Sequence, residues 1–129
     1  MEKGEILTSI RVPPPAPRSG AVYRKLATRG KLGCSAVGVG AMVVMDGDVC
    51  AEVKIVLGAV APIPMRARQA ERVVRGACLS PELLAKAGLE AYEECRPITD
   101  VRATAGYRRE VVAVLTARAI EEAVKNASV

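Results

Sequence analysis

Apolar and polar residues alternate along the first half of the chain with the period of two that is typical of β-strands. The first alternating run covers residues 5–12 and is followed at once by a proline segment, residues 13–17. Because proline cannot donate a backbone hydrogen bond to a sheet, this segment predicts the end of one strand and a stiff crossover to the next. Ser19-Gly20 is a turn signal, and residues 21–28 are predicted to form the second strand.

Two longer strands are predicted over residues 35–45 and 49–57, joined by the hairpin signal Asp46-Gly47. Both faces of the first are apolar, but one carries Gly38 and Gly40, so we expect another part of the molecule to approach it closely. In the return strand, the residues predicted to face inward are Ala51, Val53, Ile55 and Leu57.

The second half of the chain has a helical period. Residues 65–75 predict a short helix that ends at Gly76. Ser80 and Pro81 predict the start of a second helix, because serine is a good N-cap and proline is tolerated in the first turn. The last helix is predicted over about residues 104–126, and the side chains it should bury are Val112, Leu115, Ala119 and Ala123.

Strands followed by helices predict an α+β fold, in which an antiparallel sheet of three to four strands packs on three helices. With 129 residues, half of them hydrophobic, we expect one globular domain covering residues 1–129. The apolar run over residues 35–45 is too short to cross a bilayer, so we expect no membrane span. The proline segment also matches the pattern P-x-x-P, but such short matches are common by chance and a crossover is the favoured interpretation.

The net charge of +5 is concentrated near the N-terminus. Residues 1–31 hold seven Lys or Arg and two Glu, whereas the remaining residues hold equal numbers of basic and acidic side chains. Such a patch could bind a phosphate-bearing ligand or an acidic surface, but solvated surface charge is the favoured interpretation. With three Tyr and no Phe or Trp, the chain lacks the aromatic platforms that bind single-stranded nucleic acid, and we expect no nucleic-acid partner.

The residue types offer little catalytic chemistry. The chain has four cysteines without a C-x-x-C pair and no histidine, so we expect no zinc or iron–sulfur site in it. Cys50 and Cys78 lie among apolar residues, which predicts buried, reduced thiols in a cytoplasmic protein. Without histidine, no serine or cysteine has an obvious base, and we name no catalytic residue.

Two groups of arginines are expected to form structural ion pairs. In residues 68–75, Arg68, Arg72 and Arg75 share one helical face, and it is expected to be solvated and partly neutralised because Glu71 can pair with Arg68 or Arg75. In residues 102–109, arginines at a helix start oppose the helix dipole, so we expect them to pair with Asp100, Glu110 or acids of the preceding helix.

Four passages together resemble one family. "GEILTSIRVP", "YRKLATR", "VLGAVAPIPMRARQAE" and "PITDVRATAGYRREVVAVLTARAI" follow, in this order, the C-terminal domain of the FAD-binding (medium) subunit of molybdenum hydroxylases, such as carbon monoxide dehydrogenase and xanthine dehydrogenase. The resemblance covers about residues 4–122. It implies an α+β sandwich and a flavin-capping role in electron transfer from 2Fe–2S clusters through FAD to an acceptor. The implied partners are an FAD-binding N-terminal domain, an iron–sulfur small subunit and a molybdopterin large subunit.

The same resemblance assigns two cofactor-binding residues. Leu7 corresponds to an apolar residue that packs beside the flavin, and Lys25 to a lysine that reaches the flavin region. The FAD is expected to be shared with the missing N-terminal domain and not bound tightly by this chain alone. The loop over residues 26–34 is similar to the family's flavin-flanking loop, but it has Gly33-Cys34 where an acidic or polar residue is usual. The alternative function is a free-standing protein-interaction domain of the same fold without a redox role.

Overall fold

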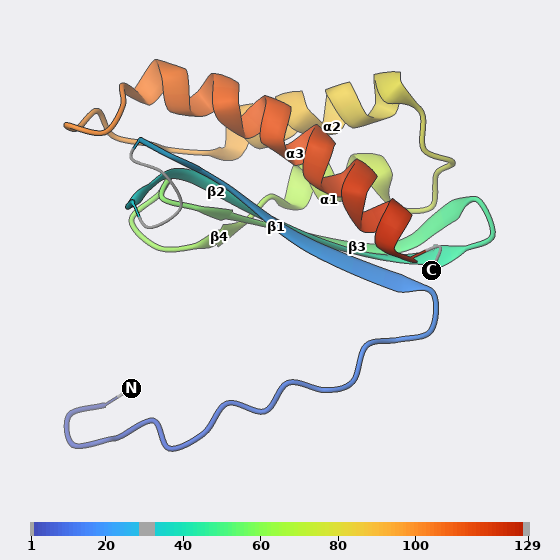
Figure 1. Cartoon of the computed structure of the whole chain (residues 1–129), viewed down its shortest axis with the longest axis horizontal. Coiled ribbons are helices and arrows are strands. Elements are labelled where there is room, and N and C mark those ends of the chain that lie inside the picture. The colour runs from blue at the N-terminus through green and yellow to red at the C-terminus, as the bar shows by residue number, and fades with distance from the viewer. Residues whose placement is uncertain (1, 29–32, 128–129) are drawn as a thin grey trace.

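A computed structural model describes residues 2–28 and 33–127. In it, the chain folds into a four-stranded antiparallel sheet followed by three helices. The strands are β1 (Ser19–Ala27), β2 (Ser35–Asp46), β3 (Val49–Gly58) and β4 (Met65–Arg66), and they lie side by side in this order. The helices are α1 (Arg68–Val74), α2 (Pro81–Glu94) and α3 (Ala105–Ala127). All three helices lie on one face of the sheet (Figure 1), which confirms the predicted α+β fold.

The predicted first strand is wrong. Residues 5–12 have no regular secondary structure and are exposed, and within the described residues they pair with no strand. The fourth place in the sheet is taken instead by the short strand β4, which pairs with β3 and shortens the helix predicted over residues 65–75. Strand propensity alone does not provide a neighbouring strand to pair with. The chain ahead of β1, which contains the proline segment, runs away from the sheet (Figure 1). We call residues 2–18 the arm.

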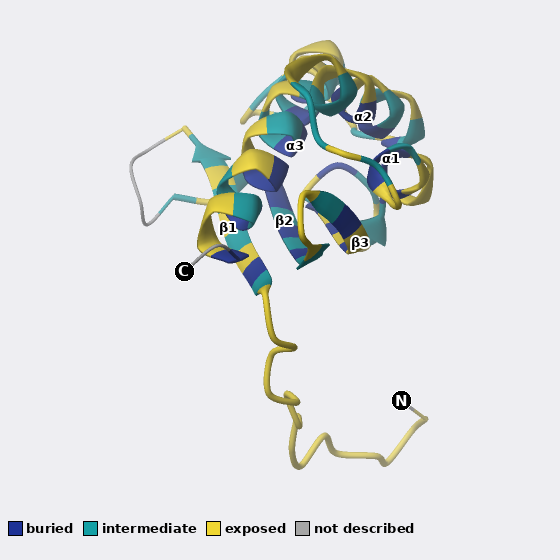
Figure 2. Ribbon diagram, turned by 90° about the vertical axis from the view of Figure 1, so that its right-hand side faces the viewer, coloured by how far each residue is buried: buried dark blue, intermediate teal, exposed yellow. Residues whose placement is uncertain are grey.

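The core lies between the sheet and the helices. Helix α3 packs on β1 and β2, whereas α1 packs on β3 and α2 packs on both of the other helices. The buried side chains of the two long strands include Val37, Val39, Val43, Val53, Ile55 and Leu57. The burial colours in Figure 2 place this layer between the helices and the sheet. The arm is exposed along its length in the same view.

One predicted inward residue, Ala51, is exposed, and Cys50 is buried instead. Val44 pairs with Glu52 and Met45 pairs with Cys50, so Ala51 is an extra residue in β3 and forms a bulge. A bulge shifts the alternation of side chains by one position, which turns Cys50 into the core. Sequence periodicity cannot show this shift because it depends on the register between two strands.

The cysteines are all free, and Cys50 and Cys95 are buried whereas Cys34 and Cys78 are exposed. The prediction that Cys78 is buried is therefore wrong. Cys78 follows the turn at Gly76 and forms an isolated bridge with Val49 at the surface. Within the loop over residues 26–34, residues 29–32 lie outside the described residues.

The helix ends agree well with the sequence signals. The hydroxyl of Ser80 accepts a hydrogen bond from the backbone N–H of Leu83 at 3.2 Å, and Pro81 is the first residue of α2. Gly76 has a φ of 75° just after α1, a conformation that glycine adopts without strain. Within the described residues, no helix is long and apolar enough to cross a membrane.

Candidate functional site

The face of the sheet that the helices leave uncovered is the candidate site. In β1, Tyr23 and Lys25 point away from the helices and are exposed. The register of β1 with β2 places Gly40 opposite Tyr23 and Gly38 opposite Lys25. A Cβ atom added at Gly38 would collide with the Tyr23 hydroxyl group and lie 3.1 Å from ring carbon Cζ. This close approach confirms the expectation that another part of the molecule lies close to the glycine-lined face. Tyr23 itself stays 63% exposed.

Lys25 differs from its neighbour Arg24 in its environment. Arg24 points toward α3, where its Nε donates to Oε2 of Glu122 at 2.6 Å. Lys25 points to the opposite face, and its Nζ donates to the backbone carbonyl of Gly33 at 3.3 Å. Among the ion pairs of the described residues, none contains Lys25. The ammonium group therefore keeps hydrogen-bonding capacity for an anionic ligand.

Leu7 lies on the arm, with 62% of its surface exposed. The last part of the arm and the outer face of the sheet enclose a groove of about 650 Å³, whose lining includes residues 12–16, Met42 and Lys54. Leu7 and Lys25 thus present their side chains to solvent from two separate elements, and their cofactor contacts stay a prediction.

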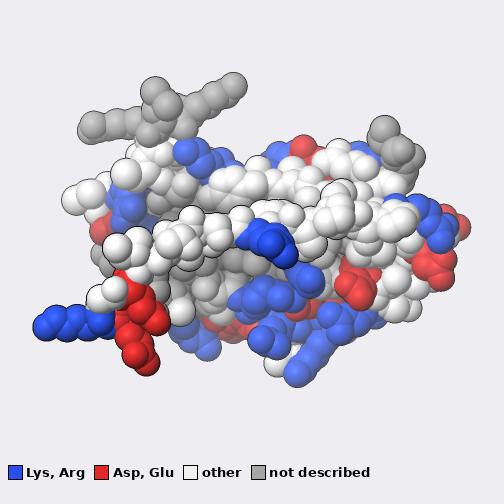
Figure 3. Space-filling model, turned by 90° about the horizontal axis from the view of Figure 1, so that it is seen from below, with Lys and Arg blue, Asp and Glu red and all other residues white. Residues whose placement is uncertain are grey.

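A second basic area lies beside β4 and α1. A pocket of about 250 Å³ there is lined by Arg66, Arg68, Glu71, Arg72 and Arg75. Lys and Arg side chains gather on the underside of the molecule in Figure 3. Arg72 donates to the side-chain oxygen of Gln69 at 3.0 Å, and within the described residues no acid forms an ion pair with Arg68, Arg72 or Arg75. This face is therefore more positive than the sequence indicated.

The pairing predicted for Glu71 is wrong. Glu71 is only 5% exposed, and its carboxylate accepts from the backbone N–H of Ile55 at 2.8 Å and from Arg66 at 2.6 and 2.8 Å. Arg66 is in reach because β4 places it beside β3, a position that the predicted helix would not have given it. The arginines of the α1 face consequently lose the acid that was expected to neutralise them.

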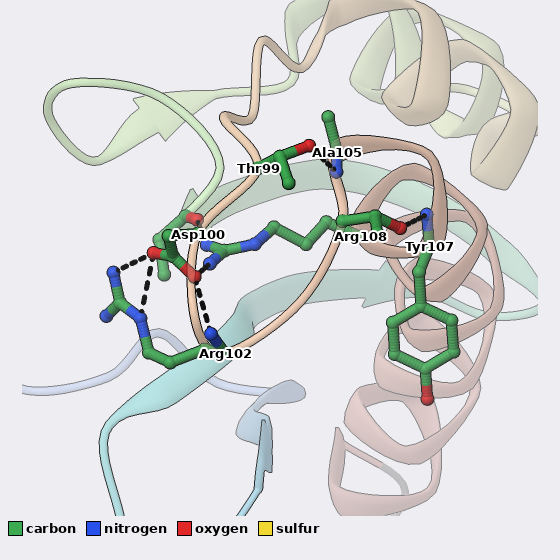
Figure 4. A network of polar contacts seen from close by, with 8 residues as sticks. Thr99, Asp100, Arg102, Ala105, Tyr107 and Arg108 are labelled. Carbon is green, nitrogen blue, oxygen red and sulfur yellow. Dashed lines mark hydrogen bonds and ion pairs between the residues drawn. The ribbon is translucent and has the colours of Figure 1, made fainter.

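Ahead of α3, Asp100 organises the network shown in Figure 4. It accepts hydrogen bonds from the backbone N–H of Arg102 at 2.8 Å, from Nε of Arg102 at 3.0 Å, and from the guanidinium of Arg108. The side chain of Arg102, then its backbone N–H, and the Arg108 guanidinium hold the pKa of Asp100 well below its usual value. The prediction that arginines of this segment pair with Asp100 is confirmed.

Arg108 connects this network to the sheet. Its side chain is 1% exposed, and one terminal nitrogen donates to the carbonyl of Ala59 at 2.7 Å. Ala59 has a φ of 62°, a conformation that is uncommon outside glycine and aims this carbonyl at the arginine. No sequence signal could have identified Ala59 as the acceptor, because every residue has a backbone carbonyl group. The network fixes the segment before α3 against the end of β3.

No group of three or more His, Cys, Asp or Glu residues that could hold a metal ion occurs within residues 2–28 and 33–127. Arg109 lies over the ring of Tyr92, with 5.7 Å from Cζ to the ring centroid. These side chains stabilise the helix layer and add no group to the outer face of the sheet.

Known proteins resemble this chain in both sequence and structure. The family model described as the CO dehydrogenase flavoprotein C-terminal domain matches residues 21–123. The carbon monoxide dehydrogenase medium chain of Afipia carboxidovorans is 37% identical over 124 residues, which cover 95% of this chain and 42% of that protein. A putative xanthine dehydrogenase FAD-binding subunit of Escherichia coli K12 is 28% identical over 125 residues, covering 96% of this chain and 43% of that protein. A chain in a crystal structure of the Cu,Mo-CO dehydrogenase superposes with a TM-score of 0.90 at 33% identity, covering 98% of this chain and 44% of that one.

The chain therefore spans less than half the length of the curated relatives that it matches. The family match runs from within β1 to most of α3, and the superposition extends over nearly all residues, including most of the arm.

Proposed function

Because the chain belongs to the family of CO dehydrogenase flavoprotein C-terminal domains, we propose that it caps the flavin in the FAD-binding subunit of a molybdenum hydroxylase. The observation that carries this proposal is the family match over residues 21–123, together with relatives named as a medium chain and an FAD-binding subunit. In this role FAD, when bound, takes electrons that arrive from 2Fe–2S clusters and passes them to an acceptor. The proposed partners are an FAD-binding N-terminal domain, an iron–sulfur small subunit and a molybdopterin large subunit, all in the cytoplasm.

The chemistry of the outer sheet face supports a flavin neighbour. Lys25 has no carboxylate partner among the described ion pairs, so its charge is available to a phosphate or to an electron-rich ring. Leu7 presents an exposed aliphatic side chain that can cover an apolar ring face. We propose that these two residues contact the cofactor, Lys25 by hydrogen bonding and Leu7 by excluding water.

This chain alone does not supply a complete cofactor site. The sequence has neither of the glycine-rich phosphate-binding patterns G-x-G-x-x-G and G-x-x-x-x-G-K-[ST]. The groove between arm and sheet is open and lined largely by apolar residues and prolines. We therefore expect the isolated chain to bind FAD weakly, with the main phosphate contacts supplied by the preceding part of the subunit.

Co-expression tests the proposal directly. The tagged chain would be produced together with the part of the Afipia carboxidovorans medium chain that lies outside the matched region, and the purified material analysed for both polypeptides and for flavin. We expect a complex that retains FAD, whereas the chain alone should stay colourless when FAD is added. Failure of the two polypeptides to associate would favour the alternative of a free-standing interaction domain. Tight stoichiometric FAD binding by the chain alone would contradict the shared site.

A matched pair of variants tests the role of Lys25. Lys25→Gln removes the charge near the proposed flavin, and the control Lys86→Gln removes a charge from an exposed residue of α2, on the helix side of the sheet. Since a hydrogen bond to a charged group contributes about 1.5–3 kcal/mol, the first variant should weaken FAD retention by about tenfold or more. The second should leave it unchanged. Equal effects of the two variants would indicate a general electrostatic contribution and not a contact.

A further inference from the structure

Four arginines meet around the small pocket beside β4 and α1, which we call the arginine pocket. Its volume is about 250 Å³, and all five of its lining residues are charged: Arg66, Arg68, Glu71, Arg72 and Arg75. Four positive charges against one negative charge give the lining a net charge of +3. Because like charges gathered in a concave surface attract counter-ions, the arginine pocket is suited to an anionic ligand.

Two acids beside α1 are already engaged with other donors. The carboxylate of Glu71 accepts from the backbone N–H of Ile55 at 2.8 Å and from Arg66 at 2.6 and 2.8 Å. The carboxylate of Glu94 accepts from two backbone N–H groups in the first turn of α1, at 2.9 and 3.3 Å. The three exposed arginines of the arginine pocket therefore have no carboxylate partner within the described residues.

Two of the four guanidinium groups are held in position. Arg66 binds Glu71 through Nε and one terminal nitrogen, which leaves its other terminal nitrogen unused on a side chain that is 35% exposed. Arg72 donates from one terminal nitrogen to the side-chain oxygen of Gln69 at 3.0 Å. Arg68 and Arg75 form no hydrogen bond or ion pair within the part of the chain that the structure describes. Donors that are fixed before binding reduce the entropy lost when a ligand is bound.

The spacing of the arginines along α1 is unfavourable without a ligand. Arg68 and Arg72 are four residues apart, and Arg75 follows three residues later. Like charges at this spacing destabilise a helix. The opposite side of α1 is fixed by the buried side chains of Ala70 and Val74, so the arginines cannot turn away from one another as a group. An anion bound between them offsets this repulsion.

The chemistry of the donors favours a phosphate group over a carboxylate. A guanidinium is planar and presents parallel N–H groups that match two oxygens of a phosphate. A phosphate has enough oxygens to accept from several arginines at once, whereas a carboxylate has only two. Pockets for drug-sized ligands have volumes of about 300–1,000 Å³, so the arginine pocket is suited to a single phosphate group and not to a whole cofactor.

The arginine pocket and Lys25 lie at opposite edges of the sheet. Lys25 belongs to β1 and Arg66 to β4, and the strand order is β1-β2-β3-β4. Neighbouring strands are about 4.8 Å apart, which separates β1 from β4 by about 14 Å. One phosphate group cannot contact both, so a ligand of the arginine pocket is not the ligand proposed for Lys25.

We propose that the arginine pocket binds one phosphate group, as the free ion or as the end of a nucleotide. Arg68, Arg72 and Arg75 supply the exposed donors, and Arg66 supplies a donor that is fixed by its bond to Glu71. This inference does not depend on the proposed function, because every residue that it uses lies in this chain and away from Lys25.

Calorimetric titration with inorganic phosphate and with AMP tests the inference. The buffer contains neither phosphate nor sulfate, and chloride keeps the ionic strength constant. We expect saturable binding to one site. Equal affinities for the two probes would identify the free ion as sufficient, whereas tighter binding of AMP would identify a nucleotide, and both results support the phosphate site.

Matched variants locate the bound phosphate. Arg72→Gln removes a charge-assisted contact and should weaken binding by about tenfold or more. Arg118→Gln removes the same charge from an exposed residue of α3 and should leave binding unchanged, as should Lys25→Gln. Since these three side chains are not buried, the variants should melt at nearly the temperature of the unaltered chain. In NMR spectra, phosphate should shift the Nε–H signals of Arg68, Arg72 and Arg75.

The remaining outcomes would overturn the inference. Binding that does not saturate, or that Arg118→Gln weakens as much as Arg72→Gln, would mean an adventitious ion only. Binding that Lys25→Gln removes and Arg72→Gln retains would place the phosphate on the outer face of the sheet and leave the proposed function intact. A hexaglutamate peptide that binds more tightly than phosphate and displaces it would identify an acidic protein surface as the ligand. Conversely, phosphate binding by a chain that fails the co-expression test would overturn the proposed function alone.

Discussion

Replacing Gly88 by alanine should force α2 and α3 apart. Gly88 is buried in the middle of α2, where the backbones of the two helices meet. An added Cβ would lie 3.1 Å from the carbonyl carbon and 3.4 Å from Cα of Ala113, and closer still to the Ala113 carbonyl oxygen. Since all three atoms belong to the backbone of α3, no side-chain rotation relieves the contact. The helices have to separate, which loosens packing along their interface.

Two opposing effects set the magnitude. Overpacking of a buried position costs about 1–3 kcal/mol, and the rigid neighbour places Gly88 in the upper part of that range. Alanine in place of glycine within a helix contributes about 1 kcal/mol in the other direction. The net loss of unfolding free energy is therefore about 1–2 kcal/mol. The chain should stay folded, because small domains are typically stable by about 5–15 kcal/mol.

Gly106 is the matched control for this prediction. It lies in the first turn of α3, and no atom is within 4 Å of the Cβ that alanine would add there. Gly106→Ala should therefore stabilise the protein by up to about 1 kcal/mol from helix propensity and reduced unfolded-state freedom.

Thermal and urea unfolding of the two variants measure the difference. One kcal/mol changes the melting temperature by about 3–6 °C for a domain of this size, so the two variants should melt roughly 10 °C apart. If Gly88→Ala is as stable as Gly106→Ala, the backbones of α2 and α3 do not approach as closely as the structure has them.

Three further predictions concern the helix start, the acidic network and the thiols. Ser80→Ala removes the N-cap acceptor of α2 and should lower the unfolding free energy by about 1 kcal/mol, measured in urea, whereas Ser80→Asp should restore most of it. Because Arg102 and Arg108 hold the pKa of Asp100 low, its contribution to stability is present above about pH 4 and is lost as the pH falls further toward the folded-state value. Melting temperatures between pH 6 and pH 2 should therefore decline less steeply for Asp100→Asn than for the unaltered chain, and parallel curves would contradict the linkage. Burial raises the pKa of the Cys50 and Cys95 thiols, so an alkylating reagent should modify the two exposed cysteines first and reach these two only on unfolding, as peptide mass spectrometry would show; equal rates would refute their burial.

The candidate site could be predicted only in part. Lys25 and Leu7 were assigned through the family resemblance, since neither an exposed lysine nor an aliphatic residue carries a chemical signature of its own. The contrast between Lys25 and the paired Arg24 depends on which face of β1 each side chain occupies and on Glu122, almost a hundred residues away. The unpaired state of the α1 arginines depends on the burial of Glu71.

The amino-acid sequence by itself determined the elements whose signals are local. The alternation of β2 and β3, the hairpin at Asp46-Gly47, the Ser80 cap of α2 and the course of α3 all follow from interactions among near neighbours in the chain.

Tertiary structure alone decided the features that need a distant partner. Residues 5–12 have strand propensity, yet they are not a strand here because no sheet edge in the described domain accepts them. Residues 65–66 have a helical pattern, yet they join the sheet because β3 offers them backbone partners. The orientation of the Cys50 side chain toward the core and the hydrogen bond from Arg108 to the Ala59 carbonyl also depend on a partner far away in the sequence. A backbone hydrogen bond requires two segments in register, and the residues of one segment do not specify where the other will lie.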